Sequence, residues 1–223
     1  MKIVAIIVAG GRGKRMGEPK QFLKINGKPM LAWTVAAFQN VKAIDGIILV
    51  VAPEQLAQAK RIKASKIIAI VPSGAKRQDS VRNGLAVLPE KTQIVLIHDG
   101  ARPAVTADLI NHSLKMVRET GAVVVGVPVK DTIKKIKHQG SKILDVETID
   151  RRELWAAQTP QTFTAPIIKK AYERLGEEVT DDGMAVEKIG LPVRMVMGSY
   201  ENIKVTTPED LNIMAAILKR RRK

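Results

Sequence analysis

The chain alternates short runs rich in Val and Ile with longer segments of helical periodicity, and this alternation narrows the folds open to it. Short apolar runs bounded by turn residues are typical of buried strands, whereas apolar residues three and four apart indicate helices. We expect strands at 3–9, 46–52, 67–71, 93–98, 122–127 and 192–197. We expect helices at 29–39, 53–63, 77–88, 106–119, 165–175 and 181–189. The pattern predicts an α/β fold, a mostly parallel sheet with helices on both faces.

The length of the chain and its final segment complete this outline. With 223 residues and 45% apolar content, the chain is long for one domain and short for two, so we expect a single domain over residues 1–223.

A last helix is well marked at its start. Thr207 can cap it, Pro208 suits its first turn, and Glu209 and Asp210 complement its dipole.

A glycine-rich loop carrying several cations follows the first strand. Gly10, Gly11 and Gly13 permit a tight bend whose N–H groups can approach phosphate oxygens. The spacing matches neither the dinucleotide fingerprint nor the Walker A loop, and a solvated turn is the alternative. However, cations confined to one short loop repel one another unless an anion joins them. These cations are Arg12, Lys14, Arg15 and Lys20, and we interpret the loop as a polyphosphate cradle.

A second chemical signal, the segment HDGARP, follows the strand at 93–98. The loops after residues 9, 71 and 98 should meet at the carboxyl ends of a parallel sheet. A carboxylate facing phosphates there suits Mg²⁺, so Asp99 is our metal ligand, with a helix-capping or loop-stabilising role as the alternative. We assign His98 no catalytic role, and three scattered histidines make zinc a poor candidate.

Residues 130–152 interrupt the alternation of strands and helices. Two short alternating stretches flank Gln139-Gly140, which predicts a two-stranded arm projecting from the fold. An isolated hairpin is marginal in water, so we expect it to pack on a second subunit. The alternative is a basic hairpin packed on its own domain.

Charge and composition limit the partners. The net charge of +15 suggests anionic partners, which leaves nucleic acid and small phosphates open. An RNA-binding module would interleave aromatic residues with basic ones, but aromatic residues make up only 3% of the chain. The absence of cysteine is compatible with a cytoplasmic protein. No apolar run reaches the ~18 residues of a membrane span, so we expect no membrane contact.

The order of motifs along the chain resembles one enzyme family nearly end to end. The motifs are VAGGRGKRMGEPKQF, SGAKRQDSVRNGL, HDGARP, PVKDTIK, DRRELWAAQTPQ, TDDGMAVE and ENIKVTTPEDL. In this order they resemble the 2-C-methyl-D-erythritol 4-phosphate cytidylyltransferases of non-mevalonate isoprenoid synthesis. The resemblance implies a Rossmann-like nucleotidyltransferase fold, a homodimer built by the arm, and Mg²⁺-dependent transfer of CMP from CTP with release of pyrophosphate.

The resemblance also implies roles for individual residues in nucleotide binding. Arg15 and Lys20 match the pair that stabilises the transition state, and Asp99 matches the metal ligand. The remaining positions would surround the nucleotide, with the loop before Ser80 reading the cytosine. They are Ala9, Gly10, Gly11, Gly13, Gly74, Ser80 and Gly100. For Ser80 alone, helix capping or solvent exposure is the alternative.

A further set of positions is similar to the family's acceptor-binding residues: Thr132, Arg151, Thr180 and Lys204. The family resemblance implies that Thr132 and Arg151 in the arm reach the partner's active site. For Arg151 the alternative is a surface ion pair of little energetic value. The same scaffold also serves cytidylyltransferases acting on D-ribitol 5-phosphate, and composition does not separate the two acceptors.

Overall fold

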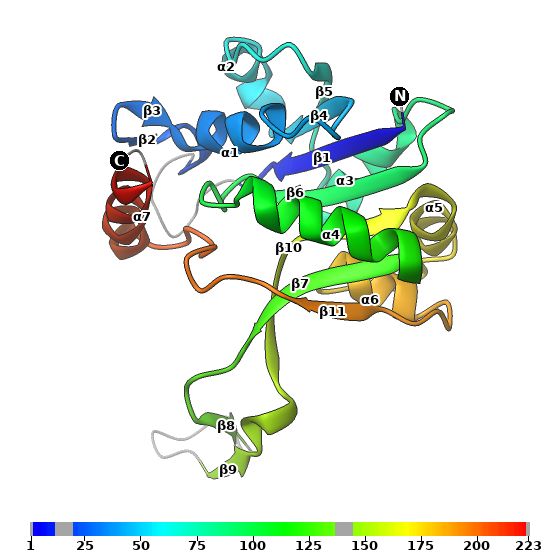
Figure 1. The fold of residues 1–223 in the computed structure, drawn as a ribbon, viewed down its shortest axis with the longest axis vertical. Helices are drawn as coiled ribbons and strands as arrows, with labels where there is room; N and C mark the ends of the chain where they lie inside the picture. Colours follow the sequence, from blue (N-terminus) through cyan, green and yellow to red (C-terminus); the bar gives the residue numbers. More distant parts are fainter. Residues whose placement is uncertain (1, 12–19, 137–144, 222–223) are drawn as a thin grey trace.

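The computed structural model describes residues 2–11, 20–136 and 145–221, built around a seven-stranded sheet (Figure 1). The strand order across this sheet is β11-β7-β10-β6-β1-β4-β5. The strands are β1 (Ile3–Ala9), β4 (Gly46–Val51), β5 (Ile67–Pro72), β6 (Ile94–Asp99), β7 (Ala122–Pro128), β10 (Trp155–Thr164) and β11 (Arg194–Met197). All six strands predicted from the apolar runs are therefore confirmed, with bounds shifted by at most two residues.

The strand β10 was missed by the sequence analysis. It pairs antiparallel with β6 on one side and β7 on the other, whereas the remaining pairs of this sheet are parallel. Its sequence, WAAQTPQTFT, is polar and contains Pro160, a residue that argues against a central strand. The pairing of β10 with β7 is irregular between Ala157 and Gln161, and this irregularity accommodates the proline.

Helices cover both faces of the sheet, as predicted. α1 (Met30–Gln39), α2 (Leu56–Ala59) and α4 (Ala107–Thr120) pack on one face, and α3 (Arg77–Ala86), α5 (Ala165–Glu173) and α6 (Asp182–Glu187) pack on the other. In β1, Ala5 and Ile7 join the first core while Val4 and Ile6 join the second. Because both faces are buried, the strand reads as a continuous apolar run.

The helix predicted over 53–63 is much shorter in the structure. A 3₁₀ turn at Pro53–Gln55 precedes α2, which ends at Ala59. The N–H groups of Arg61 and Ile62 then bond to carbonyl groups three residues back rather than four. This tightening ends the helix and leaves the residues after Lys60 as a turn.

The last helix, α7 (Pro208–Arg220), begins where the capping signals placed it. The Asp210 carboxylate accepts hydrogen bonds from the backbone N–H groups of Thr206 and Thr207 at 2.7 and 2.9 Å. Met214 and Leu218 pack against Ile25 of a small hairpin, β2 (Lys24–Ile25) and β3 (Lys28–Pro29). Among the helices of the described ranges, none combines the length and the apolar character needed to cross a membrane.

The arm is present as a two-stranded antiparallel ribbon that projects away from the main sheet (Figure 1). It comprises β8 (Ile133–Ile136) and β9 (Val146–Ile149), which lie within the predicted segment. The predicted turn at Gln139-Gly140 lies outside the described residues. Ile136 and Val146 are exposed on the ribbon at 39% and 51%, so the described part of the hairpin presents apolar side chains on its surface.

Packing of α3 against the sheet yields a test of the fold. A Cβ atom on Gly84 would lie 2.6 Å from Cγ2 of Ile6 and 3.2 Å from Cγ2 of Val50. We expect Gly84→Val to lower the free energy of unfolding by about 1–3 kcal/mol, since a full core must be overpacked. Gly176→Val is the control, because a Cβ atom there meets nothing within 4 Å. Equal urea midpoints for the two variants would contradict this packing.

Candidate active site

A cavity of about 270 Å³ lies beyond the carboxyl ends of β1 and β6, where the strand order reverses. Open α/β sheets bind ligands at this switch point. The cavity is lined by the loop after β1, the 3₁₀ turn Lys20–Phe22, the loop before α3 and the end of β6. Lys204, which precedes α7, also lines it. The residues predicted for the site that line it are Gly10, Gly11, Lys20, Gly74, Ser80, Asp99 and Lys204.

Two glycines allow the loops around this cavity to approach closely. A Cβ atom on Gly10 would lie 2.2 Å from Cβ of Ser73, and one on Gly74 would lie 2.3 Å from Cβ of Asp79. Neither position has room for a side chain. The backbones of the two loops are thereby exposed to the cavity, as a site that cradles phosphate or a base requires.

Ser80 ties the second loop together. Its hydroxyl accepts a hydrogen bond from the Gly74 N–H group at 3.2 Å and donates one to the Lys76 carbonyl at 3.1 Å. The side chain is buried, and it fixes the conformation of the loop that precedes α3. One lone pair of the hydroxyl oxygen remains for a ligand.

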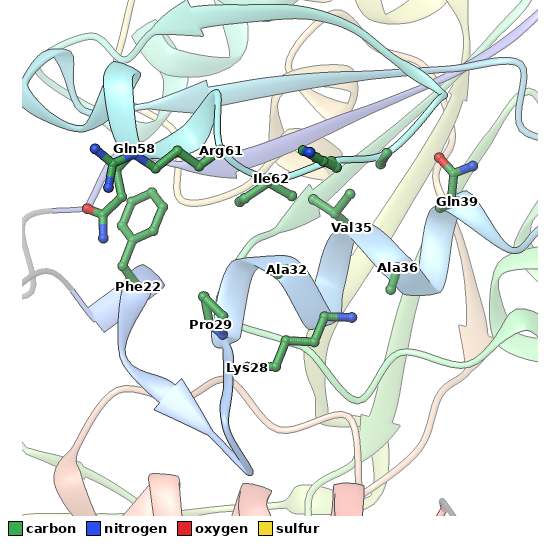
Figure 2. Close-up of a pocket in the computed structure, with 12 residues that line it drawn as sticks. Phe22, Lys28, Pro29, Ala32, Val35, Ala36, Gln39, Gln58, Arg61 and Ile62 are labelled. Atoms are coloured by element: carbon green, nitrogen blue, oxygen red, sulfur yellow. The ribbon is translucent and has the colours of Figure 1, made fainter.

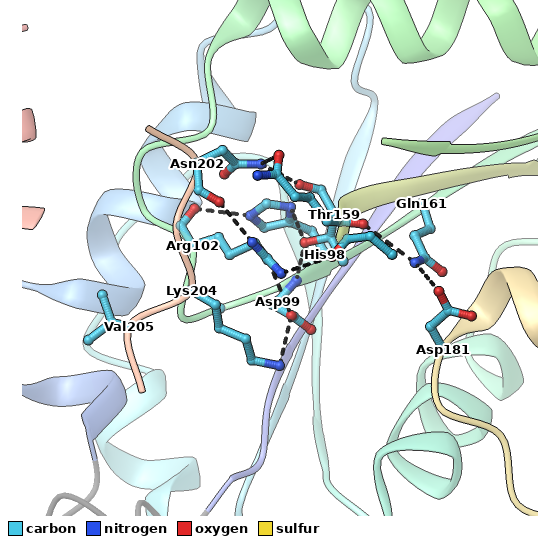
Figure 3. Close-up of polar contacts among 12 residues, drawn as sticks. His98, Asp99, Arg102, Thr159, Gln161, Asp181, Asn202, Lys204 and Val205 are labelled. Atoms are coloured by element: carbon cyan, nitrogen blue, oxygen red, sulfur yellow. Dashed lines mark hydrogen bonds and ion pairs between the residues drawn. The ribbon is translucent and has the colours of Figure 1, made fainter. Parts of the chain in front are cut away.

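Asp99 is the electrostatic centre of the cavity (Figure 3). Its carboxylate lies 3.0 Å from Nζ of Lys204 and 3.5 Å from Nε of both Arg77 and Arg102. Burial alone would raise the pKa of Asp99, but the charges of Arg77, Lys204 and Arg102 outweigh it and hold that pKa well below its ordinary value. The carboxylate is therefore ionised at neutral pH.

A chain of hydrogen bonds beneath Asp99 orients the backbone that carries it. Nε2 of His98 faces the Arg102 carbonyl at 3.2 Å, so this nitrogen carries the proton and Nδ1 accepts. The Thr159 hydroxyl then donates to Nδ1 at 3.0 Å and accepts from the Asp99 N–H group at 3.0 Å. Burial lowers the pKa of His98 to about 4, so the ring stays neutral. His98 thus links the Arg102 carbonyl to the Thr159 hydroxyl beneath Asp99.

The irregular segment of β10 supplies further polar groups around the hydrogen bonds beneath Asp99. Asn202 donates through Nδ2 to the Thr159 carbonyl at 2.8 Å, and Gln158 donates through Nε2 to the Ser199 carbonyl at 2.9 Å. These bonds tie the bulged strand to the segment that carries Lys204. A bulge next to a functional site commonly re-aims side chains in this way.

Arg77 links Asp99 to a second buried carboxylate. Its Nη2 atom lies 2.7 Å from Oδ2 of Asp182, whose Oδ1 accepts a hydrogen bond from the Tyr172 hydroxyl at 2.6 Å. Burial opposes the charge of Arg77, but the attraction of Asp182 and Asp99 raises its pKa above the ordinary value. Arg77 therefore stays charged, and it links Asp182 of α6 to Asp99 in the cavity through two ion pairs.

The other predicted site residues lie in different places. Ala9 is buried at the end of β1, and a Cβ atom on Gly100 would lie 2.9 Å from its side chain, so these two positions pack together. Thr180 is exposed before α6, and its hydroxyl donates to the Met184 sulfur. Gly13 and Arg15 lie outside the described residues.

The structure does not bring the arm residues to this cavity. Thr132 and Arg151 are exposed on or beside the ribbon, and neither lines the cavity of its own chain. An Arg151 guanidinium N–H donates to the Lys130 carbonyl. Of the four residues predicted to bind the acceptor, Lys204 lines this cavity, whereas Thr132, Arg151 and Thr180 do not.

Sequence reasoning missed several residues of the site. Arg77 and Arg102 lie within the motifs SGAKRQDS and HDGARP, where their type and position gave a usable signal for pairing with a nearby carboxylate. Thr159 and Asn202 gave none, because their role depends on the antiparallel insertion of β10.

Comparison with known proteins decides the family. The family model for 2-C-methyl-D-erythritol 4-phosphate cytidylyltransferase matches residues 3–220. The chain belongs to this family. The protein of that name from Desulforamulus reducens is 48% identical, over 98% of this chain and 97% of its own length. The one from Alkaliphilus metalliredigens is 47% identical, over 99% and 95%.

Solved structures give the same result. The 4-diphosphocytidyl-2C-methyl-D-erythritol synthase of Anaerococcus prevotii superposes with a TM-score of 0.85 at 33% identity, covering 98% of this chain and 96% of its own. The resemblance read from the ordered motifs, the Rossmann-like fold and the assignment as a nucleotidyltransferase of the 2-C-methyl-D-erythritol 4-phosphate cytidylyltransferase family are thus confirmed.

The buried neutral His98 predicts a pH dependence of stability. Its pKa of about 4 lies below the value near 6.5 expected in the unfolded chain, so the unfolded state binds more protons between these values. Stability from this group is complete above about pH 6.5 and is lost as the pH falls towards 4. We expect His98→Asn to flatten the decline of the melting temperature over that range, whereas exposed His112→Asn should leave the slope unchanged. Parallel slopes for all three proteins would contradict this assignment.

Proposed function

We propose that the chain transfers CMP from CTP to 2-C-methyl-D-erythritol 4-phosphate and releases pyrophosphate. Family membership supports the reaction class. The observation that carries the proposal is the convergence of Lys20, Asp99 and Lys204 with the Gly10–Gly11 and Gly74–Ser80 backbones on one cavity. This arrangement suits a reaction in which positioning and charge neutralisation do most of the work.

The triphosphate is assigned to the first loop and the base to the second. Gly10, Gly11 and Gly13 would offer backbone N–H groups, while Arg15 and Lys20 would neutralise the charge developing on the α-phosphate and pyrophosphate. Lys20 lines the cavity, and its Nζ donates a hydrogen bond to the Val205 carbonyl at 2.7 Å. Ala9, Gly74, Ser80 and Gly100 would enclose the cytidine, whose polar edge needs buried partners for discrimination.

Mg²⁺ is the proposed cofactor, and the donor set of the cavity fits it. Within the described ranges, no three His, Cys, Asp or Glu side chains cluster as a dedicated metal cage. An ionised Asp99 would supply one carboxylate ligand, and Mg²⁺ takes the remainder from phosphate oxygens and water. When bound, it would polarise the phosphates. Asp99 would hold it, while Arg77 and Arg102 fix the orientation of that carboxylate.

The acceptor is assigned to residues from two subunits. Lys204 lies in the cavity, and Thr180 lies in the loop before α6. We propose that Thr132 and Arg151 of a second subunit complete the site through the projecting arm, since an arginine fork can bind two phosphate oxygens. The exposed apolar side chains of the ribbon support a homodimer contact there. D-Ribitol 5-phosphate remains the rival acceptor, to be separated by assay.

Three further proposals concern the whole chain. The single seven-stranded sheet supports one nucleotidyltransferase domain over residues 1–223, with residues 130–152 as its arm. A cytoplasmic location stays a prediction from the lack of cysteine. The absence of nucleic-acid and membrane partners also stays a prediction.

The reaction is tested with CTP, Mg²⁺ and each polyol phosphate in turn, recording pyrophosphate release. We expect turnover with 2-C-methyl-D-erythritol 4-phosphate and little with D-ribitol 5-phosphate. Lys20→Ala should lower kcat by roughly 100-fold or more, because a charge that stabilises the transition state is lost. Exposed Lys24→Ala is the matched control and should keep activity. Near-normal turnover by folded Lys20→Ala, or preference for ribitol phosphate, would refute the proposal.

The two-subunit site predicts complementation. Arg151→Ala and Lys20→Ala homodimers should each be nearly inactive, whereas a mixed dimer contains one site with both residues intact. We expect purified heterodimers to recover up to about half of the activity per site pair. Affinity tags on the two subunits verify the mixture, and verified heterodimers without recovery would contradict a shared site.

A further inference from the structure

A second cavity, of about 400 Å³, lies between α1 and the segment around α2 (Figure 2). No described residue lines both this cavity and the active-site cavity. Phe22 extends from the turn Lys20–Phe22 at one end, and Val35 of α1 and Ile62 line its middle. The volume is within the range of small-molecule sites.

Cationic and amide side chains lie at the rim of this largely apolar cavity. Lys28, Arg61 and Lys63 belong to its lining, and none of the described residues of that lining is a carboxylate. Figure 2 places Gln58 and Arg61 together at the end where Phe22 lies. In the part of the chain that the structure describes, neither Arg61 nor Lys63 forms an ion pair. A wall of apolar side chains with positive charge and amide donors at its edge is complementary to an anion on an apolar chain.

The cavity is joined to the active site by three consecutive residues. Lys20 lines the active-site cavity, the Gln21 side chain donates to the Gly11 carbonyl at 2.8 Å, and Phe22 lines the second cavity. These residues form one 3₁₀ turn, so Phe22 and Lys20 belong to the same short backbone segment. A ligand packed against Phe22 would therefore contact the same turn that carries Lys20 of the proposed phosphate cradle.

We propose that this second cavity is an effector site for a phosphate monoester of a short apolar chain. Arg61 and Gln58 bind the phosphate group, and Phe22, Val35 and Ile62 contact the chain. Occupancy changes the affinity of the active site for CTP through the turn Lys20–Phe22. The site lies outside the proposed catalytic machinery, so its ligand binding is measurable without turnover.

Hexyl phosphate is the probe, with inorganic phosphate and hexanol as its separate halves. We expect saturable binding of hexyl phosphate by calorimetry, and binding at least about tenfold weaker for each half, because both the charge and the chain contribute. Arg61→Gln should weaken hexyl phosphate binding about tenfold. The matched control is Arg118→Gln, an exposed arginine on α4, which should bind as the unmodified chain does.

A second variant locates the bound probe. Ala36→Trp places a large side chain within the lining of this cavity and leaves the active-site cavity unchanged. We expect it to abolish hexyl phosphate binding while CTP binding persists, which also verifies folding. The site would be overturned if the unmodified chain did not bind hexyl phosphate. It would also be overturned if Arg61→Gln and Ala36→Trp bound hexyl phosphate as tightly as the unmodified chain does.

Linkage between the two cavities is tested separately. Saturating hexyl phosphate should change the Kd for CTP at least about threefold, and CTP should change the affinity for hexyl phosphate by the same factor. The change should vanish in Ala36→Trp. An unchanged Kd would overturn the effector role. Failure of the chain to turn over 2-C-methyl-D-erythritol 4-phosphate would instead refute the proposed reaction and leave these binding results intact.

Discussion

The ion cluster around Asp99 is the interaction on which the rest of the site depends. One buried carboxylate meets Arg77, Arg102 and Lys204, and of these three cations only Arg77 has a second acidic partner among the described residues, Asp182. Removing such charges from water is expensive, and each needs partners to compensate. Lys20 lines the same cavity, so cations outnumber carboxylates among the described lining residues. An anion is the natural completion of this arrangement, which is why a polyphosphate suits the cavity better than a neutral ligand.

The fold holds this cluster together by inserting one antiparallel strand. Parallel strands β1 and β6 bring the glycine loop and Asp99 to the same edge, but the polar support beneath Asp99 comes from the irregular segment of β10. Thr159 binds the backbone of Asp99, and Asn202 binds the backbone of Thr159. The strand therefore connects the metal-binding aspartate that we propose to the segment that carries Lys204.

The two kinds of strand, parallel and antiparallel, explain what the sequence could and could not predict. The parallel strands were readable because burial on both faces leaves a continuous Val/Ile run, as in β1 and β4. The glycine loop and Asp99 were readable because strand ends of a parallel sheet converge. β10 was not, since its polar residues and Pro160 carry no strand period. The pairing of Lys204 with Asp99, 105 residues earlier in the chain, has no signal in local spacing.

The turn Lys20–Phe22 shows how one short segment can serve both cavities. A 3₁₀ turn sends consecutive side chains in different directions, about 120° apart. Lys20 can therefore face the proposed triphosphate while Phe22 faces the apolar space beside α1, with Gln21 fixed to the Gly11 carbonyl between them. Because Gly11 belongs to the glycine loop itself, the two cavities share a hydrogen-bonded support. A ligand that binds one position of Phe22 better than another would couple the two cavities to the extent that the glycine loop moves with this turn, because coupling requires a difference in affinity between two states.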